Sequence, residues 1–318
     1  MQKAVGDKAN AEPGGAALSG QHVASQPLKA IALMCLAWVA FAGIDVSAKY
    51  LATVYALPMP QVVFARFLGQ FGAIILVMGL ASLPRLLASQ KPAHQLVRSL
   101  LLLGSTAANF FALKHLRIDQ TTTIGFLTPL TVALLAGPIL GEWVGWRRFL
   151  AIMVGFCGVL LAIRPGFAEV HPAFLFSLGS MCCYALFSIM TRHLARYDPP
   201  EVTLFYSLLA GTFLVAPFAW VAWMPPPDTT AVILLCTIGV WGAIGHYLFI
   251  VAHRFAQAAV IAPFVYISLI THSGAGYLVF GHVPDAWTLA GALIVIGSGL
   301  YIIRRERVLA RTANVEIK

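Results

Sequence analysis

A few ionisable side chains stand inside long apolar stretches of this chain, where a charge needs a partner or a purpose. Asp45 is one of them, and Lys49 follows four residues later, on the same face if the segment is helical. An ionised group at membrane depth costs about 2.5–3.5 kcal/mol on insertion scales. Two interpretations stay open: Asp45 is a cation or proton site, or it forms an ion pair with Lys49 that orients the helix.

Four more polar residues are candidates for binding a substrate or a coupling ion. The planar fork of Arg66 suits a carboxylate or phosphate, but the side chain could also extend to the membrane interface or join a network with Asp45. His246 and His272 lie within apolar segments, and histidine changes charge between pH 5 and 8. Each histidine could carry a proton that is coupled to substrate movement, or it could be a neutral hydrogen-bonding residue. Asn109 is a further candidate, with an amide side chain in another apolar segment.

Aromatic residues inside the apolar segments could stack on a planar organic substrate. Trp241 and Tyr266 are the preferred candidates because both lie away from the segment ends. The alternative for each is packing within a helix bundle. His246 and His253 are seven residues apart on one segment, too far to bind a metal alone, so we expect no metal site and no cofactor.

Composition and periodicity predict the elements that hold these residues. Hydrophobic residues make up 59% of the 318 and charged residues only 10%, whereas soluble domains carry roughly 25% charged residues. A bilayer core needs about 20 apolar residues per helix. Ten segments qualify: 29–51, 61–83, 97–116, 120–140, 147–164, 172–191, 202–223, 230–252, 258–280 and 286–303. The chain is therefore predicted to be an all-α membrane protein.

The net charge of +9 is distributed as in a membrane protein, not as in a nucleic-acid-binding protein. With the N-terminus in the cytoplasm, 16 Lys and Arg residues fall on the inside and 5 on the outside. The positive-inside rule then predicts that both termini are cytoplasmic. We expect the basic stretch 304–311 to contact anionic lipid, and we expect no nucleic-acid partner.

The two halves of the chain are similar to each other. At a shift of 140 residues, Ala112–Glu142 falls on Ala252–His282, so that Phe126 meets Tyr266. Each half holds five spans, and an odd number means that the second half enters the membrane from the opposite side. This predicts ten transmembrane helices as two inverted five-helix repeats, a common build for a secondary transporter. The expected units are a disordered cytoplasmic tail (1–27), the first repeat (28–165), the second repeat (170–305) and a basic cytoplasmic tail (306–318).

Short motifs in both halves resemble the drug/metabolite transporter superfamily with two EamA-type repeats. The first half has Ala-Leu-Lys-His-Leu at 112–116 and Leu-Gly-Glu at 140–142, and the second has Ala-Pro-Phe-x-Tyr at 262–266. The segments 41–50 and 64–67 resemble a bacterial subgroup with S-adenosylmethionine and riboflavin uptake proteins. The resemblance implies an inner-membrane carrier with a central cavity. His282 stands where the family usually has an acid.

We therefore expect a secondary transporter that moves a small organic metabolite by alternating access, and we expect a monomer. The prolines at 129, 217 and 263 would interrupt helices and could act as hinges. The subgroup resemblance favours uptake, and export of amino acids, related metabolites or drugs is the alternative. An intramembrane enzyme is disfavoured because the chain has no GxSxG or HExxH motif. A channel is disfavoured because channels usually repeat by parallel symmetry around a pore.

Overall fold

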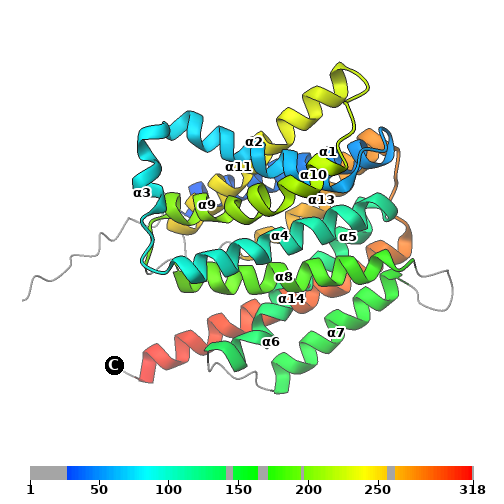
Figure 1. Cartoon of the computed structure of the whole chain (residues 1–318). Helices are drawn as coiled ribbons and strands as arrows, with labels where there is room; N and C mark the ends of the chain where they lie inside the picture. Colours follow the sequence, from blue (N-terminus) through cyan, green and yellow to red (C-terminus); the bar gives the residue numbers. More distant parts are fainter. Residues whose placement is uncertain (1–26, 141–145, 164–170, 195–196, 256–261, 317–318) are drawn as a thin grey trace, which may run out of the picture.

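The computed structural model describes residues 27–140, 146–163, 171–194, 197–255 and 262–316, and these residues form helices and no strands (Figure 1). The first half contains α1 (Pro27–Thr53), α2 (Met59–Met78), η1 (Leu80–Ser82), α3 (Leu83–Leu87), α4 (Pro92–His115), α5 (Ile118–Gly125), α6 (Thr128–Leu140) and α7 (Trp146–Ile163). The second half contains α8 (Ala173–Leu194), α9 (Pro200–Leu209), η2 (Ala210–Leu214), α10 (Val215–Val221), α11 (Thr229–Phe255), η3 (Ala262–Tyr266), α13 (Ile267–Phe280) and α14 (Ala286–Glu316). The predicted tail 1–27 lies almost wholly outside the described residues.

Six helical segments of the described chain are long and apolar enough to cross a bilayer. They are Leu28–Thr53, Met59–Met78, Pro92–His115, Ala173–Thr191, Pro200–Val221 and Thr229–Ala252. Three shorter apolar helices follow this pattern at Phe149–Ala162, Phe264–Phe280 and Ala286–Tyr301. The prediction of an all-α multi-pass membrane protein is confirmed, whereas the number of ten spans stays a prediction.

Two of the predicted spans are broken at equivalent places in the two halves. The expected span 120–140 divides into α5 and α6 at residues 126–127, just before Pro129. In the second half, η3 contains Pro263 and precedes α13. Proline has no backbone N–H and clashes with the preceding turn, which explains both breaks. A third irregularity, the π-helical turn η2, comes shortly before Pro217, as the sequence predicted.

Proline and glycine also mark the ends of several helices. Pro92 and Pro200 open α4 and α9, where the first turn has no intrahelical partner for an N–H group. Gly281 ends α13 with φ 68°, a left-handed conformation that favours glycine. These residues determine where the helices begin and end, and therefore where the connecting loops lie.

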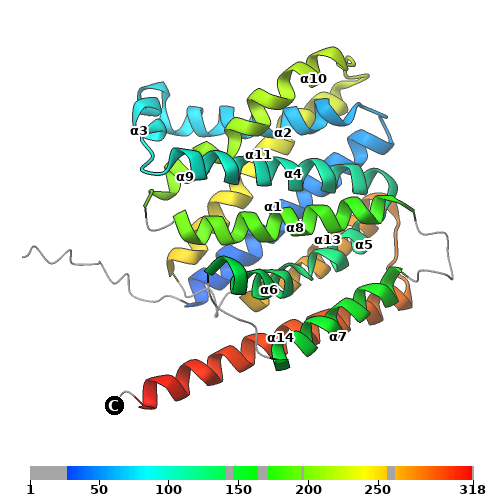
Figure 2. The same ribbon diagram turned by 60° about the horizontal axis from the view of Figure 1, so that its bottom comes forward.

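The contacts between helices follow the internal repeat, in which α1, α2 and α4 of the first half correspond to α8, α9 and α11 of the second. Helix α1 packs against α11, and the corresponding pair is α8 with α4. Likewise α2 packs against α11, and α9 packs against α4. Helices α7 and α14, the last of each half, pack against each other along one side of the bundle (Figure 2). The described ends of the chain, at the start of α1 and the end of α14, lie at the same end of the bundle (Figure 2).

The α7–α14 contact depends on small residues. A Cβ atom placed on Gly291 would lie 2.4 Å from the carbonyl oxygen of Gly158 and 2.8 Å from the Cβ of Ala162. The two backbones therefore approach as closely as helices do at small-residue contacts in membranes. This close pair also contacts α5, α6 and η3, and neither of its helices lines the cavity described below.

Candidate functional site

A cavity of about 220 Å³, lined by both apolar and polar side chains, lies between helices of both halves. Its walls come from α1, α2, α4 and the α5–α6 break of the first half, and from α8, α11, η3 and α13 of the second. Five of the seven predicted site residues line it: Asp45, Arg66, Asn109, His246 and His272. The two helix breaks also reach the cavity, through residues 125–129 and through Val265 and Ser268.

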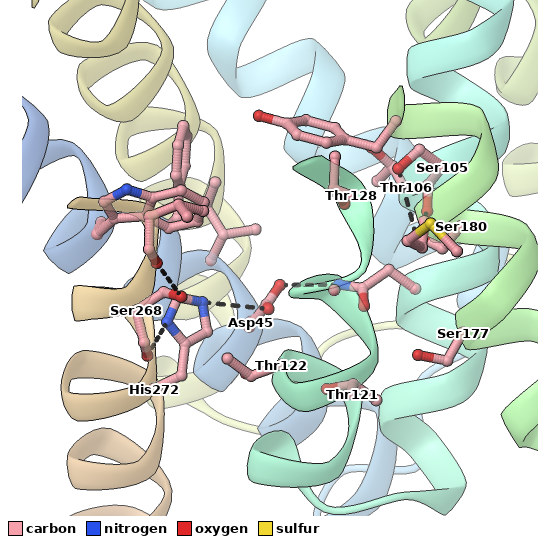
Figure 3. A pocket seen from close by; sticks show the side chains of 18 of the residues that line it. Asp45, Ser105, Thr106, Thr121, Thr122, Thr128, Ser177, Ser180, Ser268 and His272 are labelled. Atoms are coloured by element: carbon pink, nitrogen blue, oxygen red, sulfur yellow. Dashed lines mark hydrogen bonds and ion pairs between the residues drawn. The ribbon is translucent and has the colours of Figure 1, made fainter. Parts of the chain in front are cut away.

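Asp45 lies between α4 and α13, and it has a partner on each side (Figure 3). Its Oδ1 accepts a hydrogen bond of 3.0 Å from the Nδ2 of Asn109. Its Oδ2 lies 3.5 Å from the Nε2 of His272. The Asp45 carboxylate thus connects α4 of the first half to α13 of the second. Helix periodicity alone does not predict this connection.

The hydrogen-bond partner of His272 shows which of its two ring nitrogens carries a hydrogen. Its Nδ1 lies 3.0 Å from the carbonyl oxygen of Ser268, which can only accept, so Nδ1 carries a hydrogen. The other ring nitrogen, Nε2, therefore faces the carboxylate of Asp45. His272 is 4% exposed, and a separation of 3.5 Å leaves no room for a water molecule between the two groups.

Arg66 and His246 form a second polar pair at the cavity. The Nη2 of Arg66 lies 3.1 Å from the Nε2 of His246. Guanidinium only donates hydrogen bonds, so this histidine nitrogen accepts, and His246 is neutral while the contact holds. Arg66 is 4% exposed, and its Nε and Nη1 have no hydrogen-bond partner among the described residues. The alternative in which Arg66 extends to the membrane interface does not occur.

The predicted ion pair between Asp45 and Lys49 is not formed among the described residues. The ammonium group of Lys49 instead donates hydrogen bonds to the carbonyl oxygens of Leu113, at 2.8 Å, and Leu116, at 2.7 Å. Carbonyls at the C-terminal end of a helix lack intrahelical partners and carry the negative end of the helix dipole. The end of α4 therefore offers Lys49 two acceptors, and Asp45 turns to other partners.

Two predicted aromatic site residues do not line the cavity. Trp241 is 38% exposed and packs on Gly43, where an added Cβ would lie 2.9 Å from the indole ring. Tyr266 is buried, contacts Phe126 edge to face and reaches Gly299 on α14. Both residues pack between helices, the alternative that the sequence left open.

The cavity contains residues that were not among the predicted site residues. Trp38 lies seven residues before Asp45, two helical turns away on the same face, and this spacing was the signal that could have identified it. On the opposite wall, Ser105 and Ser180 join α4 to α8, with their hydroxyl oxygens 3.2 Å apart. Serine is common in apolar helices, so the sequence does not distinguish these two serines as cavity residues.

A polar cluster outside the cavity joins loops of the two halves. Asp198 precedes α9 and accepts hydrogen bonds from the Ser89 hydroxyl (2.5 Å), the Gln90 N–H (2.8 Å) and the Gln95 amide (2.8 Å). Burial opposes ionisation, but these hydrogen bonds outweigh it and hold the pKa of Asp198 below its usual value. Asp198 therefore remains ionised in the folded protein near neutral pH.

His282 lies beyond α13, next to cationic residues. Burial, and after it the charges of Lys49 and Arg117, lower the pKa of the His282 ring. Arg117 pairs with Asp119 at 3.0 Å and also donates to the carbonyl of Val283. Where the family usually has an acid, this chain therefore has a neutral ring, and Asp119 supplies the carboxylate for Arg117.

Comparison with known proteins agrees with this architecture. The chain is 28% identical over 273 residues to the S-adenosylmethionine uptake transporter of Rickettsia bellii, covering 86% of this chain and 92% of that protein. It is 28% identical over 296 residues to the riboflavin transporter of Vibrio cholerae, covering 89% and 98%. A crystal structure that is 18% identical matches with a TM-score of 0.56 over 85% of this chain and 98% of its own, which shows a shared fold. The EamA-like transporter family matches residues 28–164 and 171–304, and the chain belongs to that family.

Proposed function

We propose that this transporter takes up a small organic metabolite and binds it in the cavity between the two halves. The observation that carries the proposal is the Asp45–His272 contact, which joins α1 to α13 across that cavity. The cavity holds about 220 Å³, below the roughly 300–1,000 Å³ of typical ligand pockets. A metabolite the size of a nucleoside would therefore require the cavity to widen, and the paired helix breaks beside it are suitable hinges.

We infer that Asp45 and His272 share one proton. If neither group were protonated at Oδ2 or Nε2, a carboxylate and a ring lone pair would face each other at 3.5 Å. A proton on either group turns that repulsion into a hydrogen bond. Arg66 and His246 are the other charged or titratable groups close to this pair in the cavity, with Tyr184 on α8. The shared proton makes Asp45 and His272 the proposed coupling site, with Asn109 as a positioning residue.

The likeness to the S-adenosylmethionine and riboflavin uptake transporters supports uptake and suggests a substrate with a planar ring system. Trp38, Phe41 and Tyr184 offer ring faces at the cavity for such a group. We do not assign binding roles to Trp241 and Tyr266, because both pack between helices. The family points to a transporter rather than an enzyme.

The membrane arrangement that we propose has ten spans in two inverted repeats, 28–165 and 170–305. Both termini would face the cytoplasm, and the membrane would be the inner membrane. The excess of Lys and Arg on that side supports the orientation. The corresponding helix contacts in the two halves, such as α1 with α11 and α8 with α4, support the two repeats. We propose a monomer, because the cavity is lined from within one chain.

An uptake screen in cells that express the protein tests the function. Cells with the protein and cells with an empty vector would be given a metabolite mixture, and their contents compared by mass spectrometry at external pH 6 and 7.5. We expect one chemical class to accumulate, faster at pH 6 because the proton enters with the substrate. Selective depletion of metabolites from expressing cells would instead identify an exporter. Chemically converted products would indicate an enzyme.

A further inference from the structure

We propose that Arg66 and Trp38 form a subsite for the carboxylate of an amino-acid-type substrate; this rests on the uptake function proposed above. Both residues line the cavity. Three of their donor nitrogens are buried without an acceptor among the described residues: the Nε and Nη1 of Arg66 and the Nε1 of Trp38. Buried polar groups in native proteins are nearly always hydrogen-bonded, so each such group calls for an explanation. A ligand that supplies acceptors explains all three.

The fold shows elsewhere how it satisfies a buried arginine. Arg98 on α4 is 2% exposed, and its guanidinium donates to the Thr191 hydroxyl (2.7 Å), the Thr203 carbonyl (3.0 Å) and the Ser207 hydroxyl (2.6 Å). Arg66 is similarly buried, but within the described part of the chain its guanidinium has the ring nitrogen of His246 as its one hydrogen-bond partner, besides a stacking contact with Phe67. The difference is one of location, because Arg66 lines the cavity and Arg98 does not.

The charges that line the cavity favour an anionic group on the substrate. Among the described lining residues, the charged or readily titratable groups are Asp45, Arg66, His246 and His272. With one shared proton, Asp45 and His272 together carry no net charge, and His246 is neutral. The guanidinium of Arg66 is then an uncompensated buried cation, which a bound anion would neutralise.

The shape of the donor set favours a carboxylate. The guanidinium of Arg66 is planar, and its Nη2 has a second hydrogen besides the one that His246 accepts. Together with the unpartnered Nε or Nη1, this hydrogen can bind a planar carboxylate through two parallel hydrogen bonds. Asp45, which also lines the cavity, has carboxylate oxygens that can accept a hydrogen bond from an amine. A substrate with both groups and a planar base, as in S-adenosylmethionine, fits these features. Riboflavin has no carboxylate and would leave the Arg66 charge uncompensated.

The experiment compares S-adenosylmethionine with a compound that lacks only its carboxylate, and with riboflavin as an unrelated planar compound. Cells expressing the wild type would take up labelled S-adenosylmethionine in competition with unlabelled S-adenosylmethionine, decarboxylated S-adenosylmethionine and riboflavin. We expect the carboxylate to improve competition by about ten- to hundredfold, the range for hydrogen bonds to a charged group. Arg66→Gln should abolish this preference, and Arg66→Lys should retain part of it because it keeps the charge but not the fork. Trp38→Phe keeps a ring and removes the N–H, so it should reduce the preference about two- to tenfold.

The outcomes separate this inference from the transport function. Uptake in which the decarboxylated compound or riboflavin competes as well as S-adenosylmethionine would overturn the carboxylate subsite and leave transport intact. A folded Arg66→Gln protein that kept the full preference would also overturn it, and folding would be checked by a monodisperse elution profile in detergent. If Arg66→Gln does not fold, the wild-type competition and Arg66→Lys still decide. Failure of the wild type to take up any compound would reject the proposed uptake, and the subsite with it.

Discussion

Replacing Asp45 by asparagine separates the proposed proton from the shape of the site. The new side chain can still accept from Asn109 through its Oδ1, as Asp45 does at 3.0 Å. Its Nδ2 can donate to the Nε2 of His272, which then needs no proton. The substitution exchanges one charge-assisted contact at 3.5 Å for a neutral one, a net change of about 0.5–2 kcal/mol. The apparent Tm in detergent should therefore change by only a few degrees.

Transport by Asp45→Asn should change far more than stability. The asparagine cannot exchange a proton, so we expect uptake below about a tenth of the wild-type rate, the loss that corresponds to about 1.4 kcal/mol. The rate should also lose its dependence on external pH between 5 and 8. The assay is initial uptake into proteoliposomes that contain equal amounts of protein. Asp228→Asn is the matched control, because Asp228 is exposed before α11, accepts a hydrogen bond from Tyr55 and is not among the residues that line the cavity. Wild-type rate and pH profile in Asp45→Asn would remove Asp45 from the coupling site.

Three further predictions concern stability. Lys49→Met removes two charge-assisted hydrogen bonds to the end of α4 and should destabilise the protein by about 2–4 kcal/mol, seen as a lower apparent Tm in detergent; an unchanged Tm would contradict it. Gly291→Val forces a side chain against Gly158 and should cost about 1–3 kcal/mol, whereas tolerance in a thermal melt would show that α7 and α14 can separate. The lowered pKa of Asp198 means that its stabilising contribution is present above its unfolded pKa of about 3.9 and is lost as the pH falls through the lower folded value. Melts from pH 6 down to 3 should therefore show a steeper loss for the wild type than for Asp198→Asn, and parallel curves would refute this.

Composition and proline positions predict much of this fold, because their causes are local. Apolar length dictates membrane helices, and Pro129 and Pro263 break them wherever the rest of the chain lies. The number of spans is harder to predict from hydropathy, since a broken segment such as α5–α6 reads as one continuous apolar run. Asp45 and His272, two of the predicted site residues, both line the cavity, because charged or titratable groups inside apolar helices have few other places to lie.

The partners of these residues could not be predicted, because packing brings them together from distant parts of the chain. Arg66 and His246 are 180 residues apart, and no local rule connects them. Lys49 lies one turn from Asp45, yet the end of α4 supplies its acceptors. Trp241 fails as a cavity residue because the rotation of α11 about its axis turns the indole onto Gly43. Helix rotation depends on all neighbouring helices together.

Counterflow with a blocked cavity tests most directly whether the substrate passes between the two halves. Proteoliposomes preloaded with unlabelled S-adenosylmethionine would be given the labelled compound outside. Thr106→Trp places an indole in the cavity wall (Figure 3), and the control Leu293→Trp places one on α14, where the leucine is 65% exposed. We predict saturable counterflow for the wild type and Leu293→Trp, and none for Thr106→Trp. Undiminished counterflow in a folded Thr106→Trp protein would contradict transport through this cavity.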